Sequence, residues 1–236
     1  MSDLTTAAIN LLKDLIGLPS FSKQEDKTAN RIGEWFNHYE IPYEREGNNL
    51  WAKNKAFDPQ KPTLLLNSHH DTVKPNTAYT NDPFEAKILD GKLYGLGSND
   101  AGGALVSLIA LFTHYFDKEN PKYNLLVVAS AEEEIAGENS LRGLIPKLPK
   151  IDLAIVGEPT EMNLAVAEKG LIVFDAVIKG TSGHAAHPNA DNPIMKLPEV
   201  LNWFENFKLQ KYSDFLGDVK VLSLIHISEP TRQAEI

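Results

Sequence analysis

Four short apolar or Gly-rich runs in this chain are each followed by acidic residues, and the first run also by a histidine pair. The runs span residues 63–66, 93–97, 124–129 and 153–156, and the groups after them are His69-His70-Asp71, Asp100, Glu132-Glu133-Glu134 and Glu158. Continuous apolar runs of this length are typical of buried strands in a parallel sheet. Ligands of open α/β sheets bind beyond the carboxyl ends of the strands. Oxygen donors and a histidine gathered at that edge favour a metal site.

Helical and strand-like patterns alternate along the first part of the chain, which predicts an α/β fold. We expect helices over residues 5–17, 25–38, 104–116 and 137–147, and strands over residues 48–53, 63–67, 124–129 and 153–156. After residue 170 the pattern changes to an edge strand over 171–179 and a helix over 193–207. The sequence therefore predicts one domain over residues 1–170 and part of a smaller α+β domain over residues 171–221.

Composition excludes several classes of protein. The chain has 236 residues and a net charge of −9, so nucleic acids and anionic membranes are not expected partners. It has no cysteine, which excludes disulfides, cysteine-ligated zinc and a thiol nucleophile. The start of the chain, residues 3–18, contains Asp3, Lys13 and Asp14 and so lacks the apolar core of a signal peptide. No stretch approaches the roughly 20 apolar residues of a membrane span, and a cytoplasmic location is expected.

His69 and Asp71 have a spacing that suits a metal ligand and its orienting partner. In an extended chain, residues two apart lie on the same side. One imidazole nitrogen can then bind a metal while the carboxylate accepts the N–H of the other and fixes the tautomer. A single H-x-D is more often structural, and its position after a predicted strand favours the metal-binding interpretation.

Asp100 lies in the Gly-rich segment 95–103 and has two interpretations. Its carboxylate could cap the helix that begins near Ala104. It could instead bridge two cations, with the glycines allowing close approach of the backbone. The segment alone leaves both open.

The acidic run Glu132-Glu133-Glu134 continues a predicted buried strand. A charge run is usually a solvated surface, but here the repulsion among the carboxylates would need cations to offset it. Glu134 could bind a metal while Glu133 takes a proton from a water whose pKa the metal has lowered. Glu158 precedes Pro159, so it is either part of a turn or a further carboxylate ligand.

Four segments, in this order along the chain, resemble the M20 metallohydrolases: residues 68–73, 97–103, 131–134 and 156–160. The resemblance extends from about Thr5 to about Val221, and the wording of the motifs is most similar to acetylornithine deacetylase-like members from Bacteroidetes. It implies a zinc-exopeptidase-like catalytic domain with a mostly parallel central sheet, followed by the first part of an α+β lid and dimerisation domain.

The resemblance also implies a set of metal ligands. His69 and Glu158 would bind one zinc ion and Glu134 a second, with cobalt as a possible substitute. Asp100 would bridge the two ions and would be followed by a non-prolyl cis peptide bond.

Further roles follow from the same motifs. Asp71 would orient His69, and Glu133 would act as general base and then as general acid. His184, in the segment 180–186, matches the histidine that reaches the active site of the partner subunit in this family and helps to bind the oxyanion. His187 is the competing choice. A homodimer is therefore expected for the complete protein.

The activity that the resemblance implies is removal of the acyl group from a small N-acyl amino acid. N-acetylornithine or N-acetylcitrulline is the favoured substrate, which would place the enzyme in arginine biosynthesis. The alternatives are a succinyl-diaminopimelate desuccinylase and an M20 dipeptidase or aminoacylase. A non-enzymatic alternative is a metal-binding interaction protein on a decayed M20 scaffold, against which the retained Glu133 argues.

The end of the chain departs from the family. A final histidine ligand and the residues that bind the substrate carboxylate are expected further downstream, and His226 is rejected as that ligand. Residues 222–232 resemble a translated transposase sequencing adapter, so residues 222–236 are expected to be non-native. Different codons through 222–232 in the encoding DNA would refute this. A chain that lacks one ligand is expected to be inactive or poorly soluble.

Overall fold

The computed structural model describes residues 2–119, 121–172, 176–184, 186–188, 191–208 and 212–220. The chain divides into two compact units, one ending at Met162 and the other beginning at Asn163. This division falls slightly before the predicted boundary at residue 170. The roles predicted for the two domains stay predictions.

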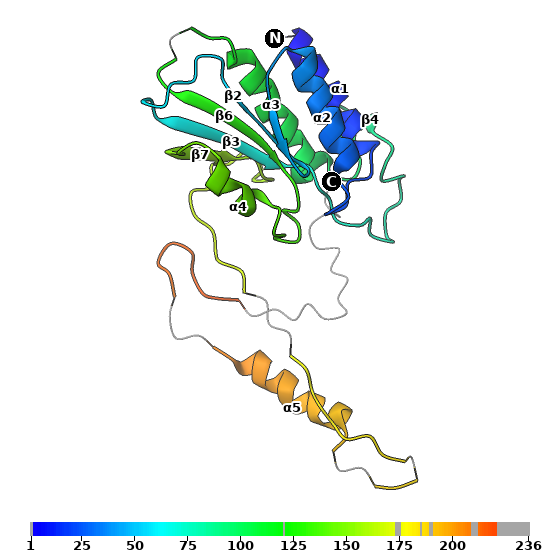
Figure 1. The fold of residues 1–236 in the computed structure, drawn as a ribbon. Helices are drawn as coiled ribbons and strands as arrows, with labels where there is room; N and C mark the ends of the chain where they lie inside the picture. The colour runs from blue at the N-terminus through cyan, green and yellow to red at the C-terminus, as the bar shows by residue number, and fades with distance from the viewer. Residues whose placement is uncertain are drawn as a thin grey trace. The chain divides into compact units, whose positions relative to one another are not determined.

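The first unit is built on a five-stranded mixed sheet with the strand order β1-β2-β6-β3-β7 (Figure 1). Its strands are β1 Glu44–Glu46, β2 Asn49–Lys53, β3 Thr63–His69, β6 Asn124–Ser130 and β7 Leu153–Val156. β3 is parallel to both β6 and β7, whereas β2 is antiparallel to β1 and to β6. The predicted α/β class is confirmed, with β6, β3 and β7 as the parallel strands of this sheet.

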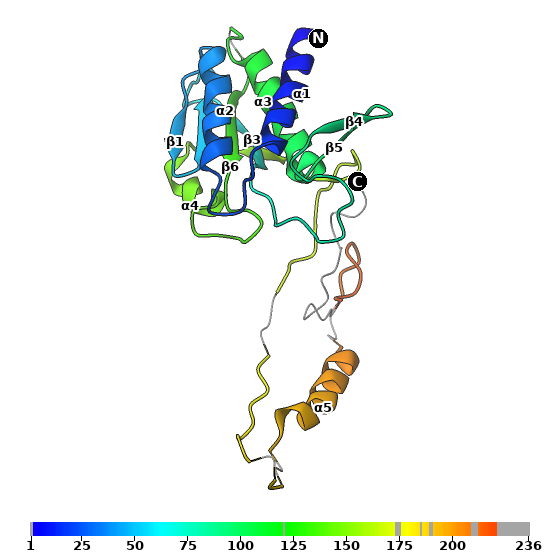
Figure 2. The ribbon, with the colours of Figure 1, turned by 90° about the vertical axis from the view of Figure 1, so that its right-hand side faces the viewer.

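Three helices cover one face of the sheet (Figures 1 and 2). They are α1 Ser2–Ile16, α2 Asp26–His38 and α3 Gly103–Tyr115, close to the predicted bounds. The core between the helices and the sheet includes Phe36, Leu66, Ile109 and Phe112, all without exposed surface. Each such side chain contributes about 1.5–3 kcal/mol through removal from water.

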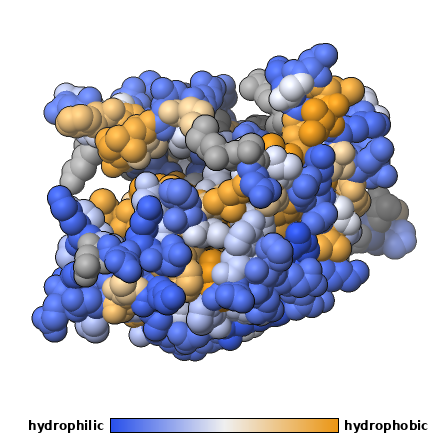
Figure 3. Space-filling view, turned by 90° about the horizontal axis from the view of Figure 1, so that it is seen from above, coloured by the Kyte–Doolittle hydropathy of each residue, from blue (hydrophilic) through white to orange (hydrophobic). Residues whose placement is uncertain are grey.

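The opposite face has a smaller cover, made of α4 Leu141–Leu144 and the 3-10 turn η2 Ile145–Lys147. Leu144 packs there against Trp51, Leu65 and Leu126. The helix predicted over residues 137–147 was too long, because residues 132–140 form turns, with positive φ angles at Glu132 and Ala136. Most of the face of the molecule that Figure 3 shows is hydrophilic, with apolar side chains in separate patches.

Two expectations about strands of the first unit need correction. β7 forms as predicted, but it is not buried: Leu153 is 66% and Val156 is 55% exposed. The reason is that β7 lies at the edge of the sheet and pairs with β3 on one side only.

The second correction concerns residues 93–97, which do not form a strand of the main sheet. β4 Lys87–Leu89 and β5 Lys92–Tyr94 form a separate antiparallel pair. The chain leaves β5 at Gly95 and Gly97, whose φ angles of +151° and +73° suit glycine. Asp100 therefore lies in an irregular turn, η1 Ser98–Gly102, which leads into α3.

In the second unit, the predicted helix is confirmed as α5 Pro193–Asn206. The Asn192 side chain caps it by accepting a hydrogen bond from the backbone N–H of Ile194 at 3.0 Å. The strand predicted over 171–179 is absent from its described residues, 171–172 and 176–179. A strand needs a partner for its backbone groups, and no strand pairs with this segment among the described residues.

Residues 173–175, His226 and the predicted non-native tail, 222–236, lie outside the described residues.

Within the described part of the chain, none of the helices combines the length and the apolar character that crossing a bilayer requires.

The buried centre and the exposed edge of the sheet suggest a stability test. Leu66→Ala should lower the free energy of unfolding by about 2–5 kcal/mol, because it leaves a cavity in the core. Leu153→Ala, on the exposed edge strand, should change it by less than about 1 kcal/mol. Urea unfolding of both variants measures the difference, and equal losses would contradict the packing described here.

Candidate metal centre

The carboxyl ends of three parallel strands bring most of the predicted site together. His69 at the end of β3 lies opposite Ser130 at the end of β6, and Asn67 lies opposite Val156 at the end of β7. The segments that follow β6 and β7 contain the acidic run 132–134 and Glu158. The parallel register therefore collects these groups at one edge, as the sequence predicts.

The carboxylates surround one nitrogen of His69. His69 Nε2 lies 3.1 Å from Asp100 Oδ1, 3.8 Å from Glu158 Oε1 and 3.9 Å from Glu133 Oε2. Possible ligand atoms of His69, Asp100 and Glu134 all lie within 4.8 Å of one another. The structure thus brings together all four predicted metal ligands and the predicted base. The peptide bond after Asp100 is cis, as the resemblance predicts.

One atom of this cluster has no hydrogen-bond partner among the described residues. Glu134 Oε1 is buried and accepts no hydrogen bond from the described residues. An unpaired buried carboxylate oxygen is costly, because it has lost its hydration without compensation. The donor set of one imidazole and several carboxylates is one that divalent cations bind. The residues present therefore fit a metal ion.

Asp71 is fully buried, and its hydrogen bonds hold other groups of the site in place. Its carboxylate accepts hydrogen bonds from Ser22 Oγ at 2.7 Å, from the Glu133 N–H at 3.0 Å and from the Glu134 N–H at 3.1 Å. His69 Nδ1 lies 2.9 Å from the Asp71 carbonyl oxygen and 3.4 Å from the carboxylate. The backbone carbonyl of Asp71 therefore makes the shorter contact with His69. The sequence predicts this contact for the Asp71 side chain instead.

The pKa values of His69, Glu134 and Asp71 are shifted in different directions. Burial opposes the charged form of His69, but Asp100, Asp71 and Glu158 outweigh it and raise its pKa to about 11. Burial, followed by the nearby Asp100 carboxylate, raises the pKa of Glu134 to about 7. Burial also opposes ionisation of Asp71, but the nearby His69 ring and the hydrogen bonds from Ser22 and from the Glu133 N–H hold its pKa below the usual value. Without a metal ion, a proton on His69 balances part of the negative charge.

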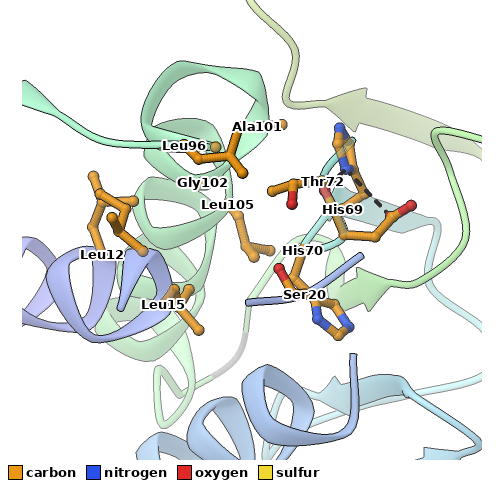
Figure 4. Close-up of a pocket in the computed structure, with 13 residues that line it drawn as sticks. Leu12, Leu15, Ser20, His69, His70, Thr72, Leu96, Ala101, Gly102 and Leu105 are labelled. Carbon is orange, nitrogen blue, oxygen red and sulfur yellow. Dashed lines mark hydrogen bonds and ion pairs between the residues drawn. The ribbon is translucent and has the colours of Figure 1, made fainter. Parts of the chain in front are cut away.

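The second histidine of the pair turns away from the cluster (Figure 4). His70 Nδ1 lies 2.8 Å from Thr28 Oγ1, and its Nε2 lies 2.9 Å from the Asn48 carbonyl oxygen. Burial lowers the pKa of His70. A neutral ring then donates from Nε2 to Asn48 and accepts at Nδ1 from Thr28. Figure 4 also shows the small pocket beside His69, with apolar side chains such as Leu12 and Leu105 lining it.

His184 lies in the second unit, where the Ala186 N–H donates to its Nδ1 at 3.1 Å. The ring of His187 lies 5.6 Å from that of His184, measured between centroids. The choice between these two histidines stays a prediction. Sequence reasoning missed Glu25, a fully buried carboxylate that contacts the acidic run. It was assigned only to the start of a helix, and no local pattern distinguishes it from a solvated acid.

Comparison with protein families gives an independent result. Residues 65–233 match the model of peptidase family M20/M25/M40. Two curated relatives are the succinyl-diaminopimelate desuccinylases of Rickettsia felis and Rhodospirillum centenum, each 28% identical to this chain. The alignments cover 88% and 82% of this chain but only 60% and 55% of those proteins. The chain thus spans less than two thirds of the length of these relatives.

Solved structures agree on the fold. An M20 family metallo-carboxypeptidase from Sulfolobus solfataricus matches with a TM-score of 0.53 and 27% identity, over 66% of this chain and 37% of that one. A dinuclear metal-binding M20 peptidase from Bacillus subtilis matches with a TM-score of 0.52 and 21% identity, over 66% of this chain and 43% of that one. With the family match over most of its length and the ligand cluster at the sheet edge, this chain belongs to peptidase family M20.

Proposed function

We propose that this chain forms the catalytic part of a dinuclear metal-dependent amidohydrolase that cleaves the amide bond of an N-acyl amino acid. The observation that supports this most directly is the unpaired, buried Glu134 oxygen among His69, Asp100 and Glu158. A cation is the partner that this arrangement lacks. The dinuclear metal site of the structural neighbour from Bacillus subtilis supports the stoichiometry.

His69 and Glu158 would hold one ion, Glu134 the other, and Asp100 both, with zinc as the expected metal and cobalt as a substitute. Bound ions of this type polarise a carbonyl group and lower the pKa of a water molecule. Asp71 keeps His69 Nδ1 engaged, so that His69 Nε2 faces the cluster. The protein therefore presents this ligand in a fixed orientation before a metal arrives.

Glu133 is suited to move protons. Its side chain is 54% exposed, and its carboxylate lies at the edge of the cluster, 3.9 Å from His69 Nε2. Its backbone N–H is fixed by Asp71, so the side chain can accept a proton from the attacking water and deliver it to the leaving amine. We retain His184 as the group that stabilises the oxyanion from a partner subunit, which implies a homodimer.

Among substrates, we favour N-succinyl-diaminopimelate over N-acetylornithine. The curated relatives named here are desuccinylases, whereas the motif wording alone supports N-acetylornithine or N-acetylcitrulline. The test uses the zinc-loaded protein at the full length of its relatives. It measures the release of free amine from N-succinyl-diaminopimelate, N-acetylornithine, N-acetylcitrulline and a dipeptide. Preference for an acetylated substrate would overturn the choice. Metal binding without any hydrolysis would favour a non-enzymatic role.

Replacement of the proposed base provides a sharper test. In the same protein, Glu133→Gln should lower kcat by about 10²–10⁴-fold, because the amide cannot accept a proton. Bound metal, measured by atomic absorption, should stay unchanged, since Glu133 is not a proposed ligand. Glu138→Gln, at a nearby exposed position, is the matched control and should retain activity. Retained turnover in Glu133→Gln would assign the base elsewhere.

Metal binding should release protons in a pH-dependent way. Both His69, with a pKa of about 11, and Glu134, with a pKa of about 7, must be deprotonated to act as ligands. Zinc binding at pH 7 should therefore release about 1.5 protons, falling towards about one at pH 9. Calorimetric titrations in buffers of different ionisation enthalpy measure this number.

Glu134→Gln is the matched variant for this titration. It removes the group whose protonation changes near pH 7, so proton release should stay at about one between pH 6 and pH 8. Zinc binding to the unmodified protein with no net proton release at pH 7 would contradict the assignment of His69 as a ligand.

A further inference from the structure

Glu25 is a buried carboxylate that the proposed chemistry does not use. It has no exposed surface and lies just before α2. Its Oε1 accepts hydrogen bonds from the Lys23 N–H at 2.8 Å and from the Glu132 N–H at 3.1 Å. Its Oε2 accepts one from Asn48 Nδ2 at 2.9 Å. Both oxygens are therefore occupied by protein donors, and Glu25 is not available as a metal ligand.

The contact with Glu132 lies where the chain makes a sharp turn after β6. Glu132 has a φ angle of +54°, in the left-handed region that side chains other than glycine rarely adopt. Its carbonyl oxygen accepts from the Gly137 N–H at 2.9 Å, and its buried carboxylate accepts from Asn139 Nδ2 at 2.8 Å. Glu132 is thus held at its N–H, its carbonyl and its side chain, which fixes the direction of the chain that follows.

The next two residues contain the reactive carboxylates. The N–H groups of Glu133 and Glu134 both donate to Asp71. Three consecutive backbone N–H groups are therefore bound by two buried carboxylates, Glu25 first and Asp71 after it. Glu133 Oε2 lies 3.9 Å from His69 Nε2, and an oxygen of Glu134 lies within 4.8 Å of a possible ligand atom of His69.

Hydrogen bonds also link Glu25 to the end of β3. The Asn48 carbonyl oxygen lies 2.9 Å from His70 Nε2, and the Asn48 side chain donates to Glu25. Glu25 thus connects the end of β3, through His70, with the acidic run after β6.

We propose that Glu25 is a positioning residue for the metal centre: by holding the Glu132 N–H in its left-handed turn, it sets the placement of Glu133 and Glu134 relative to His69. This inference rests on the proposed function of the cluster as a metal site. It assigns Glu132 a structural role, distinct from those of its two neighbours.

Cobalt binding to the protein at the full length of its relatives tests the proposal without requiring turnover. Visible absorption of bound Co²⁺ reports the ligand geometry, and its titration gives the dissociation constant. Glu25→Ala removes the acceptor for the Glu132 N–H and should weaken Co²⁺ binding by about 10–100-fold and change the spectrum. Glu25→Gln keeps one acceptor oxygen and should recover part of the loss.

Leu144→Ala is the control for lost stability, because Leu144 is buried in the other core cluster. It should lower the urea midpoint while leaving the Co²⁺ affinity within about twofold of the unmodified chain, since it touches no ligand support. All variants are compared under conditions in which circular dichroism shows them folded.

Asn139→Ala keeps the test decisive if the Glu25 variants do not fold. Asn139 is exposed and holds the Glu132 side chain from outside, so its removal should weaken Co²⁺ binding by a smaller factor and shift the spectrum in the same direction. Unchanged affinity and spectra in the folded variants would overturn the positioning role. An unmodified chain that binds no Co²⁺ would instead overturn the metal site itself.

Discussion

The hydrogen bonds from the Glu133 and Glu134 N–H groups to Asp71 join the end of β6 to the end of β3. The rest of the candidate site depends on this junction. It fixes the backbone of the acidic run, and through the Asp71 carbonyl it orients His69. Backbone N–H donors also stabilise the buried charge of Asp71 in a place where water cannot. Removing this carboxylate would therefore disturb the base and two ligands together.

The site collects like charges that would separate in water. Five carboxylates, those of Asp71, Asp100, Glu133, Glu134 and Glu158, lie in or beside the cluster around one imidazole. In the absence of a metal ion, the protein limits the repulsion by binding protons, on His69 and in part on Glu134. Protons leave these groups as pH rises, and divalent cations then compete for the same carboxylates more effectively.

Much of this arrangement can be predicted from the sequence because it depends on local periodicity. The runs of β3 and β6 and the apolar faces of α1, α2 and α3 give their position and type, and the residues after β3, β6 and β7 give the site. Long-range pairing is less predictable. The edge position of β7 depends on which strands flank β3, and the separate β4–β5 pair turns at Asp90 and Gly91, both with positive φ angles. Glu25 was missed because its partner Glu132 lies 107 residues further along the chain.

A run of three glutamates suggests that the chain tolerates a one-residue shift, since a deletion or duplication of one glutamate barely changes the local composition. The left-handed turn at Glu132 removes that tolerance. The first carboxylate faces Asn139, the second is largely solvated, and the third is half-buried in the cluster. A one-residue slip would give each position its neighbour's environment. The register of the run, rather than its charge, is what the fold encodes here.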